Sequence, residues 1–209
     1  MGKKWQDWTP MADDNPSAFL RLFVALAVPL DVRKEIKRAQ GQLRRAAPPG
    51  IIRWARPEQF HLTLNFLGDV PAVQVAALEQ SVSGVCSGCP ALQLFGRGIG
   101  FFPNAKNPRV IWSGAGDKDG QLAELHRKLD AAVQPFAPAG KPERFTGHIT
   151  VGRFKPGRHA AIDKLLERAA SLSSRHFGDW PAGTVETVRS ELASMGAIHT
   201  PLVSFPLAG

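Results

Sequence analysis

The sequence predicts an α+β fold with mainly antiparallel β-sheets. Strand-like stretches outnumber helical ones, and several consecutive strands are separated only by turn residues, which favours antiparallel over parallel sheets. The order of elements begins again past the middle of the chain, so the chain divides into two rough halves. Each half contains the same four-residue pattern inside a strand-like stretch, HLTL at 61–64 and HITV at 148–151.

The first half has clear periodicity in seven segments. Dense or alternating apolar residues predict strands at 21–29, 51–57, 61–68, 92–102 and 109–114. Apolar residues at helical spacing predict helices at 31–45 and 71–85. The cluster Pro48-Pro49-Gly50 ends the first of these helices, and Pro71 is expected in the first turn of the second.

The second half is read in the same way. An amphipathic helix with acidic residues at its start is expected at 117–133, before the order of elements begins again, and a further helix is expected after that point, at 160–172. Strands are expected at 148–154, 184–194 and 201–207. The chain shows no low-complexity segment and no array of short repeats.

Composition indicates a soluble globular protein. The 209 residues suffice for one domain or two small lobes, and no apolar run approaches the roughly 20 residues that span a bilayer. Residues 1–18 lack the apolar core of a signal peptide, so we expect a flexible extension there and a cytoplasmic location. The formal charge of +8 and the pI near 10 favour a polyanionic partner.

Two short motifs point to structure rather than chemistry. Cys86 and Cys89 form a CxxC, but no further pair of ligands completes a zinc site, and the pair ends a helical pattern where a redox motif favours a helix start. The glycines of GRGIGF at 96–101 fit neither GxGxxG nor a Walker loop. We interpret them as bulge or close-approach positions in a strand, which argues against a nucleoside triphosphate site.

The repeated pattern exceeds chance. With six His and seven Thr, random placement gives about 0.2 His-x-Thr triplets, and the chain has two, 87 positions apart. Because strand side chains alternate, His61 and Thr63 point to one face, and His148 and Thr150 do likewise. Their apolar neighbours would anchor each strand in a core. A hydrogen-bonded polar edge without function is the competing interpretation.

Two imidazoles and two hydroxyls on rigid strands suit chemistry at phosphorus. Histidines can divide the acid and base roles near neutral pH, and threonine hydroxyls can donate to phosphate oxygens. In-line displacement at a phosphate gains most of its rate from positioning and charge stabilisation. No carboxylate cluster adjoins either pattern, so the sequence suggests no metal.

HLTLNFLG and HITVGRF resemble the paired motifs of the two-histidine phosphoesterases. Within that superfamily the chain is similar to the RNA 2′,3′-cyclic phosphodiesterases, also called 2′-5′ RNA ligases. The resemblance extends to RLFVALAVP, RWARPEQFHLTLNFLGD and GIGFFPNAKNPRVIWSG, and covers roughly residues 19–207. It implies one two-lobed, pseudo-symmetric domain over 19–209, with two antiparallel sheets lining a central cleft and helices packed outside.

The resemblance implies an enzyme without cofactor or metal that hydrolyses RNA 2′,3′-cyclic phosphate ends to 2′-phosphomonoesters, with reverse 2′-5′ ligation as a further activity. His61 would be the general acid toward the leaving ribose oxygen, and His148 the general base acting on water. Thr63 and Thr150 would hold phosphate oxygens. Its expected partners are RNA ends such as those of tRNA fragments, and it is expected to be a monomer that binds no membrane.

The resemblance also assigns Arg153 to the phosphate and Phe66 and Phe102 to the nucleobase. Arg153 stands an odd number of residues after His148, so strict alternation would send it to the opposite face. A bulge near Gly152 would return it to the site, and we expect one there. The alternative is that Arg153 is a solvated charge.

Some positions are given less specific interpretations. Gly147 departs from the proline that many relatives have before the second histidine, so a looser approach to His148 is expected. His126 is expected on a helix surface, and His159, His176 and His199 in loops or at helix edges. Basic residues flanking the motif-bearing segments are expected either to line an RNA path or to be solvated charges. They are Arg53, Arg56, Lys106, Arg109, Arg144, Lys155 and Arg158.

Two functional alternatives remain from the sequence. One is a non-catalytic module that holds RNA ends, and the other is a phosphodiesterase for small cyclic nucleotides. Activity on a cyclic end excludes the first. Rates on a mononucleotide and on an oligomer with the same end separate the second from an RNA enzyme.

Overall fold

The computed structural model describes residues 19–137, 145–157, 161–193 and 196–208. The expected extension at 1–18 lies outside the described residues. The helices are α1 Leu30–Ala46, α2 Val75–Cys86, α3 Gln121–Val133 and α4 Asp163–Ser171, with 3₁₀ turns η1 Pro57–Gln59, η2 Ala72–Gln74 and η3 Gln134–Phe136. The strands are β1 Phe19–Ala27, β2 Ile52–Trp54, β3 His61–Pro71, β4 Leu92–Phe102, β5 Val110–Asp117, β6 His148–Phe154, β7 His176–Ala182, β8 Thr184–Ala193 and β9 Gly196–Pro206.

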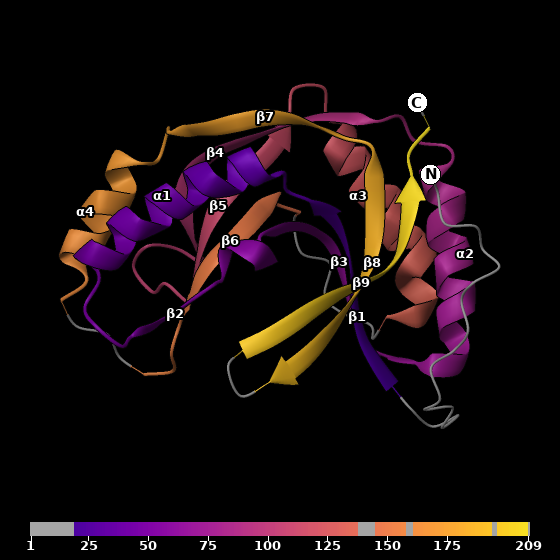
Figure 1. The fold of residues 1–209 in the computed structure, drawn as a ribbon, viewed down its shortest axis with the longest axis horizontal. Helices are drawn as coiled ribbons and strands as arrows, with labels where there is room; N and C mark the ends of the chain where they lie inside the picture. The colour runs from indigo at the N-terminus through magenta and orange to yellow at the C-terminus, as the bar shows by residue number, and fades with distance from the viewer. Residues whose placement is uncertain (1–18, 138–144, 158–160, 194–195, 209) are drawn as a thin grey trace.

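The strands form one curled, nine-stranded sheet in the order β7-β4-β5-β6-β3-β1-β8-β9, with β2 paired to β6 beside this path. All pairings between named strands are antiparallel, so the expected α+β fold is confirmed (Figure 1). The two halves join between β3 and β6 through a single register pair, Leu62 with Ile149. The two expected sheets are therefore continuous at one point, and this point lies between the two repeated patterns.

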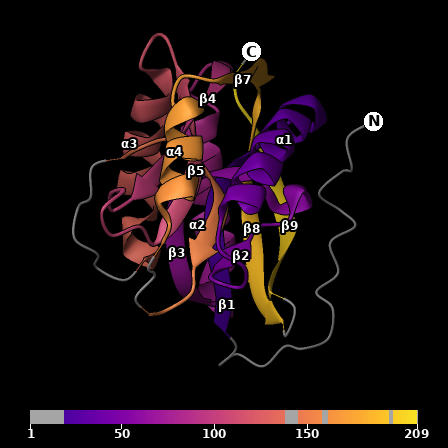
Figure 2. The ribbon, with the colours of Figure 1, turned by 90° about the vertical axis from the view of Figure 1, so that its left-hand side faces the viewer.

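The helices pack outside the curled sheet and divide between its halves. In α1 the buried residues recur at helical spacing, because Val32, Ile36, Ala39 and Leu43 all face the core. Helix α1 lies beside α4 and β7 on one half, whereas α2 and α3 pack together beside β3 and β9 on the other. Figure 2, viewed from the side of α4, shows α1 and α4 in front of the strands that they cover. No described helix is long and apolar enough to cross a membrane.

Strand β7 was not predicted. Its sequence HFGDWPA contains proline and glycine, which weaken a strand signal, yet it pairs along β4 at the edge of the sheet where a missing N–H is tolerated. After Gly183 the chain enters β8, which belongs to the other half. β9 also begins earlier than expected, at Gly196, so its opening residues reach the site.

Two helix starts differ from expectation. Pro71 ends β3 rather than opening a helix, and the turn η2 precedes α2. Helix α3 begins at Gln121 because the Asp117 carboxylate, four residues earlier, accepts hydrogen bonds from the backbone N–H groups of Gln121 and Leu122.

The two motifs expected to be structural lie in a strand and in the core. Gly98 has φ +75° at a register shift between β4 and β5, and a side chain there would collide with the carbonyl of Ser173. Cys86 and Cys89 are both buried and free. Burial raises the pKa of the Cys86 thiol to about 12, so this thiol stays protonated and unreactive at neutral pH.

Candidate active site

The junction of the two half-sheets brings the repeated patterns together. Leu62 and Ile149 pair across it with no solvent exposure, and both belong to the main core. Side chains alternate along a strand, so the residues flanking this pair point to the opposite, inner face of the curl. His61 and Thr63 on β3 therefore share a face with His148 and Thr150 on β6. Their expected adjacency is confirmed.

Both histidines are held by the same local hydrogen bond. His61 Nδ1 lies 2.7 Å from the carbonyl oxygen of Gln59, and His148 Nδ1 lies 2.8 Å from that of Thr146. A carbonyl only accepts, so each Nδ1 must carry the proton and donate it. Each neutral ring then presents the lone pair of Nε2 to the site.

Aromatic contacts fix the two rings differently. His61 stacks on Phe23 with ring centroids 4.7 Å apart and an interplanar angle of 28°. His148 meets Phe102 edge to face at 4.9 Å, and Phe102 in turn lies 5.1 Å from Trp112. Each imidazole thus has one aromatic wall, supplied by β1 in one half and by β4 in the other.

Without a bound anion, the site disfavours protonation of its two histidines. Burial, together with the charges of His199, His148 and Arg153, lowers the pKa of His61 to about 4. Burial and the Arg153 guanidinium also lower the pKa of His148. Both rings are therefore neutral at pH 7, and an anion placed between them would raise both pKa values.

A β-bulge turns Arg153 toward the histidines. Along β5, alternate residues pair with β6 so that Gly114 faces His148 and Trp112 faces Thr150, and then the register shifts. Beyond the shift Val110 pairs with Arg153, which places Arg153 on the same face as His148 and Thr150. The bulge expected near Gly152 is confirmed.

Glycine is needed at this bulge. Position 152 is buried, and a Cβ there would lie 3.0 Å from Ile52 Cγ2 and 3.1 Å from Trp54 Cε3. A side chain would push on the core side of β2, so only glycine fits without displacement.

β3 has a corresponding bulge. Ala25 of β1 pairs with Thr63, but the next register shift makes Val24 pair with Asn65 and Phe23 with Phe66. Phe66 therefore shares the face of Phe23 and is 65% exposed there, an unusual exposure for phenylalanine. Asn65 points the other way and donates to the Asp130 carboxylate of α3 at 3.0 Å.

The site includes residues that the sequence did not indicate. His199 of β9 lies edge to face with His61 at 5.0 Å and with Phe23 at 5.1 Å, and its Nδ1 is buried without a partner among the described residues. Its expected loop or helix-edge setting is wrong, because β9 begins before it. The threonine nearest to His199 follows it directly rather than two residues later, so the sequence shows no His-x-Thr pattern there. The β8–β9 hairpin, which the structure shows, places His199 at the site.

A link through Gln59 holds this part of β9. The carbonyl of Gln59 binds His61, and its side-chain amide donates to the carbonyl of Ala197, two residues before His199. The turn η1 thereby fixes both the first histidine and the strand that carries the third.

Two further expectations are corrected. His126 is half-buried rather than on the surface, since its ring stacks on Phe145 at 4.1 Å and its Nδ1 lies 3.1 Å from the carbonyl of Leu64. The approach to His148 is tight rather than loose. Gly147 accepts a hydrogen bond from Ala115 N at 3.0 Å, and a Cβ at Gly147 would collide with the Ala115 carbonyl.

No group of three or more potential metal ligands occurs within the described ranges. The site face carries imidazole, hydroxyl and guanidinium groups. Such a set can bind a phosphate and move protons to and from its oxygens.

Comparison with known proteins identifies similar chains. Residues 26–112 match the family model described as LigT like Phosphoesterase. An RNA 2′,3′-cyclic phosphodiesterase of Methanothermobacter thermautotrophicus is 33% identical over 190 residues, which cover 90% of this chain and 99% of the relative. Another protein of that name, from Thermus thermophilus, is 32% identical over 201 residues and 91% of both chains.

Solved structures have the same fold. A crystal structure of a Thermus thermophilus protein superposes with a TM-score of 0.73 at 30% identity, covering 91% of this chain and 99% of the other. Escherichia coli LigT complexed with 3′-AMP has a TM-score of 0.71 at 22% identity, with coverage of 91% and 99%. At that lower identity the second likeness concerns the fold alone.

Proposed function

The chain belongs to the family of RNA 2′,3′-cyclic phosphodiesterases, which are LigT-like phosphoesterases, and on this premise we propose that it opens RNA 2′,3′-cyclic phosphate ends to 2′-phosphomonoesters. It is a hydrolase that acts on phosphodiester bonds. One observation carries the proposal: two imidazoles on one face, each with Nδ1 bound to a carbonyl and Nε2 left to the site.

His148 is the general base in this proposal. In its neutral form Nε2 takes a proton from water as the water oxygen attacks phosphorus. The lowered pKa of His148 keeps it neutral at pH 7, so it is ready to accept that proton. The Thr146 carbonyl stabilises the imidazolium that forms, because it already accepts the Nδ1 proton.

His61 is the general acid toward the departing O3′. The bond between phosphorus and O3′ breaks, O3′ takes the proton from His61 Nε2, and the phosphate remains on O2′. Because the pKa of His61 is about 4 in the free site, the substrate must help to protonate it. The anionic phosphate does so by placing a negative charge beside the ring.

The remaining groups hold the substrate. Thr63 and Thr150 donate their hydroxyls to non-bridging oxygens, and Arg153 binds the same phosphate through its planar guanidinium. Phe66 and Phe102 contact the nucleobase, and the exposed ring of Phe66 offers a face for stacking. All five face the site together with the histidines.

We further propose that the reaction proceeds without a metal ion. We also propose that a 5′-hydroxyl can replace water and attack the phosphorus of a cyclic end, so that the bond to O3′ breaks and a 2′-5′ link remains, in a reversible ligation. His148 would take the proton of the 5′-hydroxyl and His61 would give one to O3′. In the cleavage of a 2′-5′ link back to the cyclic end, the two histidines exchange these roles. The proposed substrates are RNA ends such as those of tRNA fragments, and the proposed active form is a cytoplasmic monomer.

The decisive test uses His61→Ala and His148→Ala with a cyclic-ended oligonucleotide in EDTA. Each is expected to lower kcat by about 10²–10⁴-fold, the usual contribution of an acid or base. His176→Ala is the matched control, since His176 is exposed and pairs with Asp179 on β7. Parental rates in either site variant would refute the mechanism.

The position of the phosphate in the product shows which bond of the cyclic phosphate breaks. A 2′-phosphate supports the assignment of His61 to O3′, whereas a 3′-phosphate contradicts it. RNA binding without any opening of the cyclic end would favour a non-catalytic module.

A further inference from the structure

Arg53 of β2 lies directly opposite Arg153 in the register of β2 with β6. Residues directly opposite in an antiparallel pair project to the same face, with Cβ atoms about 4.5–5.5 Å apart. Ile52 and Trp54, the neighbours of Arg53, pack with the core on the other face. Arg53 therefore stands beside Arg153 on the face that carries His148.

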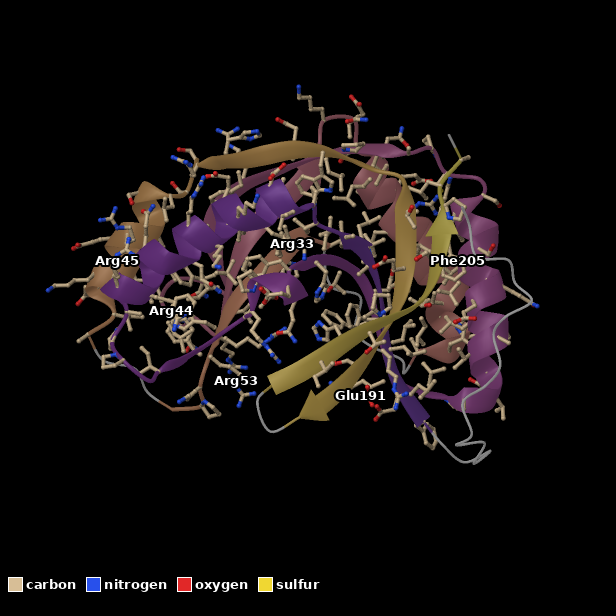
Figure 3. The ribbon with its side chains drawn as sticks, viewed as in Figure 1. Arg33, Arg44, Arg45, Arg53, Glu191 and Phe205 are labelled. Atoms are coloured by element: carbon tan, nitrogen blue, oxygen red, sulfur yellow. The ribbon has the colours of Figure 1, made fainter. Side chains whose placement is uncertain are left out.

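Neither guanidinium has an ion-pair partner among the residues that the structure describes. Figure 3 shows Arg53 on the side of β2 toward the β8–β9 hairpin, where Glu191 is the labelled acidic residue. Glu191 is already paired with Arg189 at 2.9 Å. Like charges directly opposite one another destabilise a sheet, so a bound anion would stabilise this pair of arginines.

The reacting phosphate offers one negative charge for two arginines. A cyclic phosphodiester carries a single negative charge, and the proposed function assigns it to the two histidines, the two threonines and Arg153. Along β6, Arg153 is three residues beyond Thr150, or about 10 Å at the usual rise per residue. β2 and β3 lie along the same edge of β6, and Arg53 is level with Arg153 in the register. With the reacting phosphate assigned to Arg153, Arg53 is left for a second anion.

We propose that Arg53 forms a second phosphate subsite, which binds the phosphate on the 5′ side of the terminal nucleotide. This inference rests on the proposed function and adds the residue that would favour a nucleotide chain over a lone cyclic nucleotide. A chain phosphodiester and the 5′-phosphate of a mononucleotide share this chemistry, and the RNA backbone is the assigned source.

The test compares three substrates with the same terminal base. They are a 2′,3′-cyclic nucleotide without a 5′-phosphate, the same nucleotide with a 5′-phosphate, and a trinucleotide with the same cyclic end. Arg53→Gln removes the charge and keeps a polar side chain. Arg45→Gln is the control, because Arg45 lies in the last turn of α1, beside Arg168 of α4.

Arg53→Gln is expected to lower kcat/KM for the trinucleotide by about tenfold or more, the usual effect of losing a charged hydrogen bond. The cyclic nucleotide without 5′-phosphate should be opened at the parental kcat/KM. The salt dependence of trinucleotide binding should lose about one unit of slope, and Arg45→Gln should change none of these values.

Three outcomes would overturn the inference. An equal loss on all three substrates would place Arg53 at the reacting phosphate. No loss on any would make it a solvated charge, and a loss confined to the 5′-phosphorylated mononucleotide would exclude the RNA backbone as its ligand. A parental enzyme that opens no cyclic substrate would instead refute the proposed function, so the two failures are distinguishable.

Discussion

Phe66 and Arg153 occupy equivalent places in the two halves of the sheet. Each follows its site histidine by five residues, and each is turned to the site face by a β-bulge after the threonine. Both halves therefore contain the same β-bulge, but the bulge presents a different side chain in each half. One offers an exposed aromatic ring and the other a guanidinium, which makes a nearly symmetric fold asymmetric in its chemistry.

The pH dependence of kcat/KM should reflect the lowered histidine pKa values. The reaction needs one proton on the pair, and the free enzyme holds a single proton only between its two apparent pKa values. That of His61 is about 4 and that of His148 is below 6.5. We expect kcat/KM to peak between about pH 4 and 6.5. We expect kcat to stay high up to a higher pH, because the bound phosphate raises the pKa values of both histidines. A kcat/KM maximum above pH 7 would contradict this.

His199→Phe should shift the acidic limb of the same profile. The charge of His199 lowers the pKa of His61, and phenylalanine keeps an aromatic ring while removing that charge. The lower apparent pKa in kcat/KM should therefore rise, with kcat changing less than about tenfold because no proton passes through His199. His176→Phe serves as the control. An unchanged or lowered acidic limb would show that His199 does not act on His61.

Gly152→Ala should impair both stability and activity. The added Cβ meets Ile52 and Trp54, and overpacking of this kind costs about 1–3 kcal/mol. Displacement of the bulge would also move Arg153, so KM should rise. Urea denaturation and steady-state kinetics measure the two effects.

Gly84→Ala is the matched control for that substitution. Gly84 is an exposed position of α2, and a Cβ placed there would meet no neighbouring atom within 4 Å. In a helix interior this change should stabilise by about 0.5–1 kcal/mol. Parental stability and activity in Gly152→Ala would refute the role given to the bulge.

Stability should fall as the pH drops from about 6.5 to 4. His61 is neutral in the folded protein down to about pH 4, whereas the unfolded chain binds a proton near pH 6.5. The contribution of neutral His61 to the free energy of unfolding is therefore present above pH 6.5. It is lost as the pH falls from 6.5 to 4, and the loss amounts to up to about 3 kcal/mol. His61→Gln cannot titrate, so its unfolding free energy should fall less steeply than that of the parent. Equal slopes in urea unfolding at pH 7, 6, 5 and 4 would contradict the burial of a neutral His61.

The sequence by itself determined the α+β class, most strands and the two repeated His-x-Thr patterns. Alternation within HLTL and HITV is a local property, since side chains two residues apart share a face wherever the strand lies. The placement of His61 with Thr63, and of His148 with Thr150, followed from it. The odd spacing of Arg153 and the glycine before it allowed a bulge, and the resemblance to the two-histidine phosphoesterases was the main reason to predict one.

Only the tertiary structure decided what lies beside these strands. His199 reaches His61 because the β8–β9 hairpin folds against β1, and Arg53 meets Arg153 because β2 pairs with β6. Both are pairings between residues far apart in the chain, which no local periodicity encodes. The lowered pKa of His61 has the same origin, because burial and neighbouring charges exist only after the halves have joined at Leu62 and Ile149.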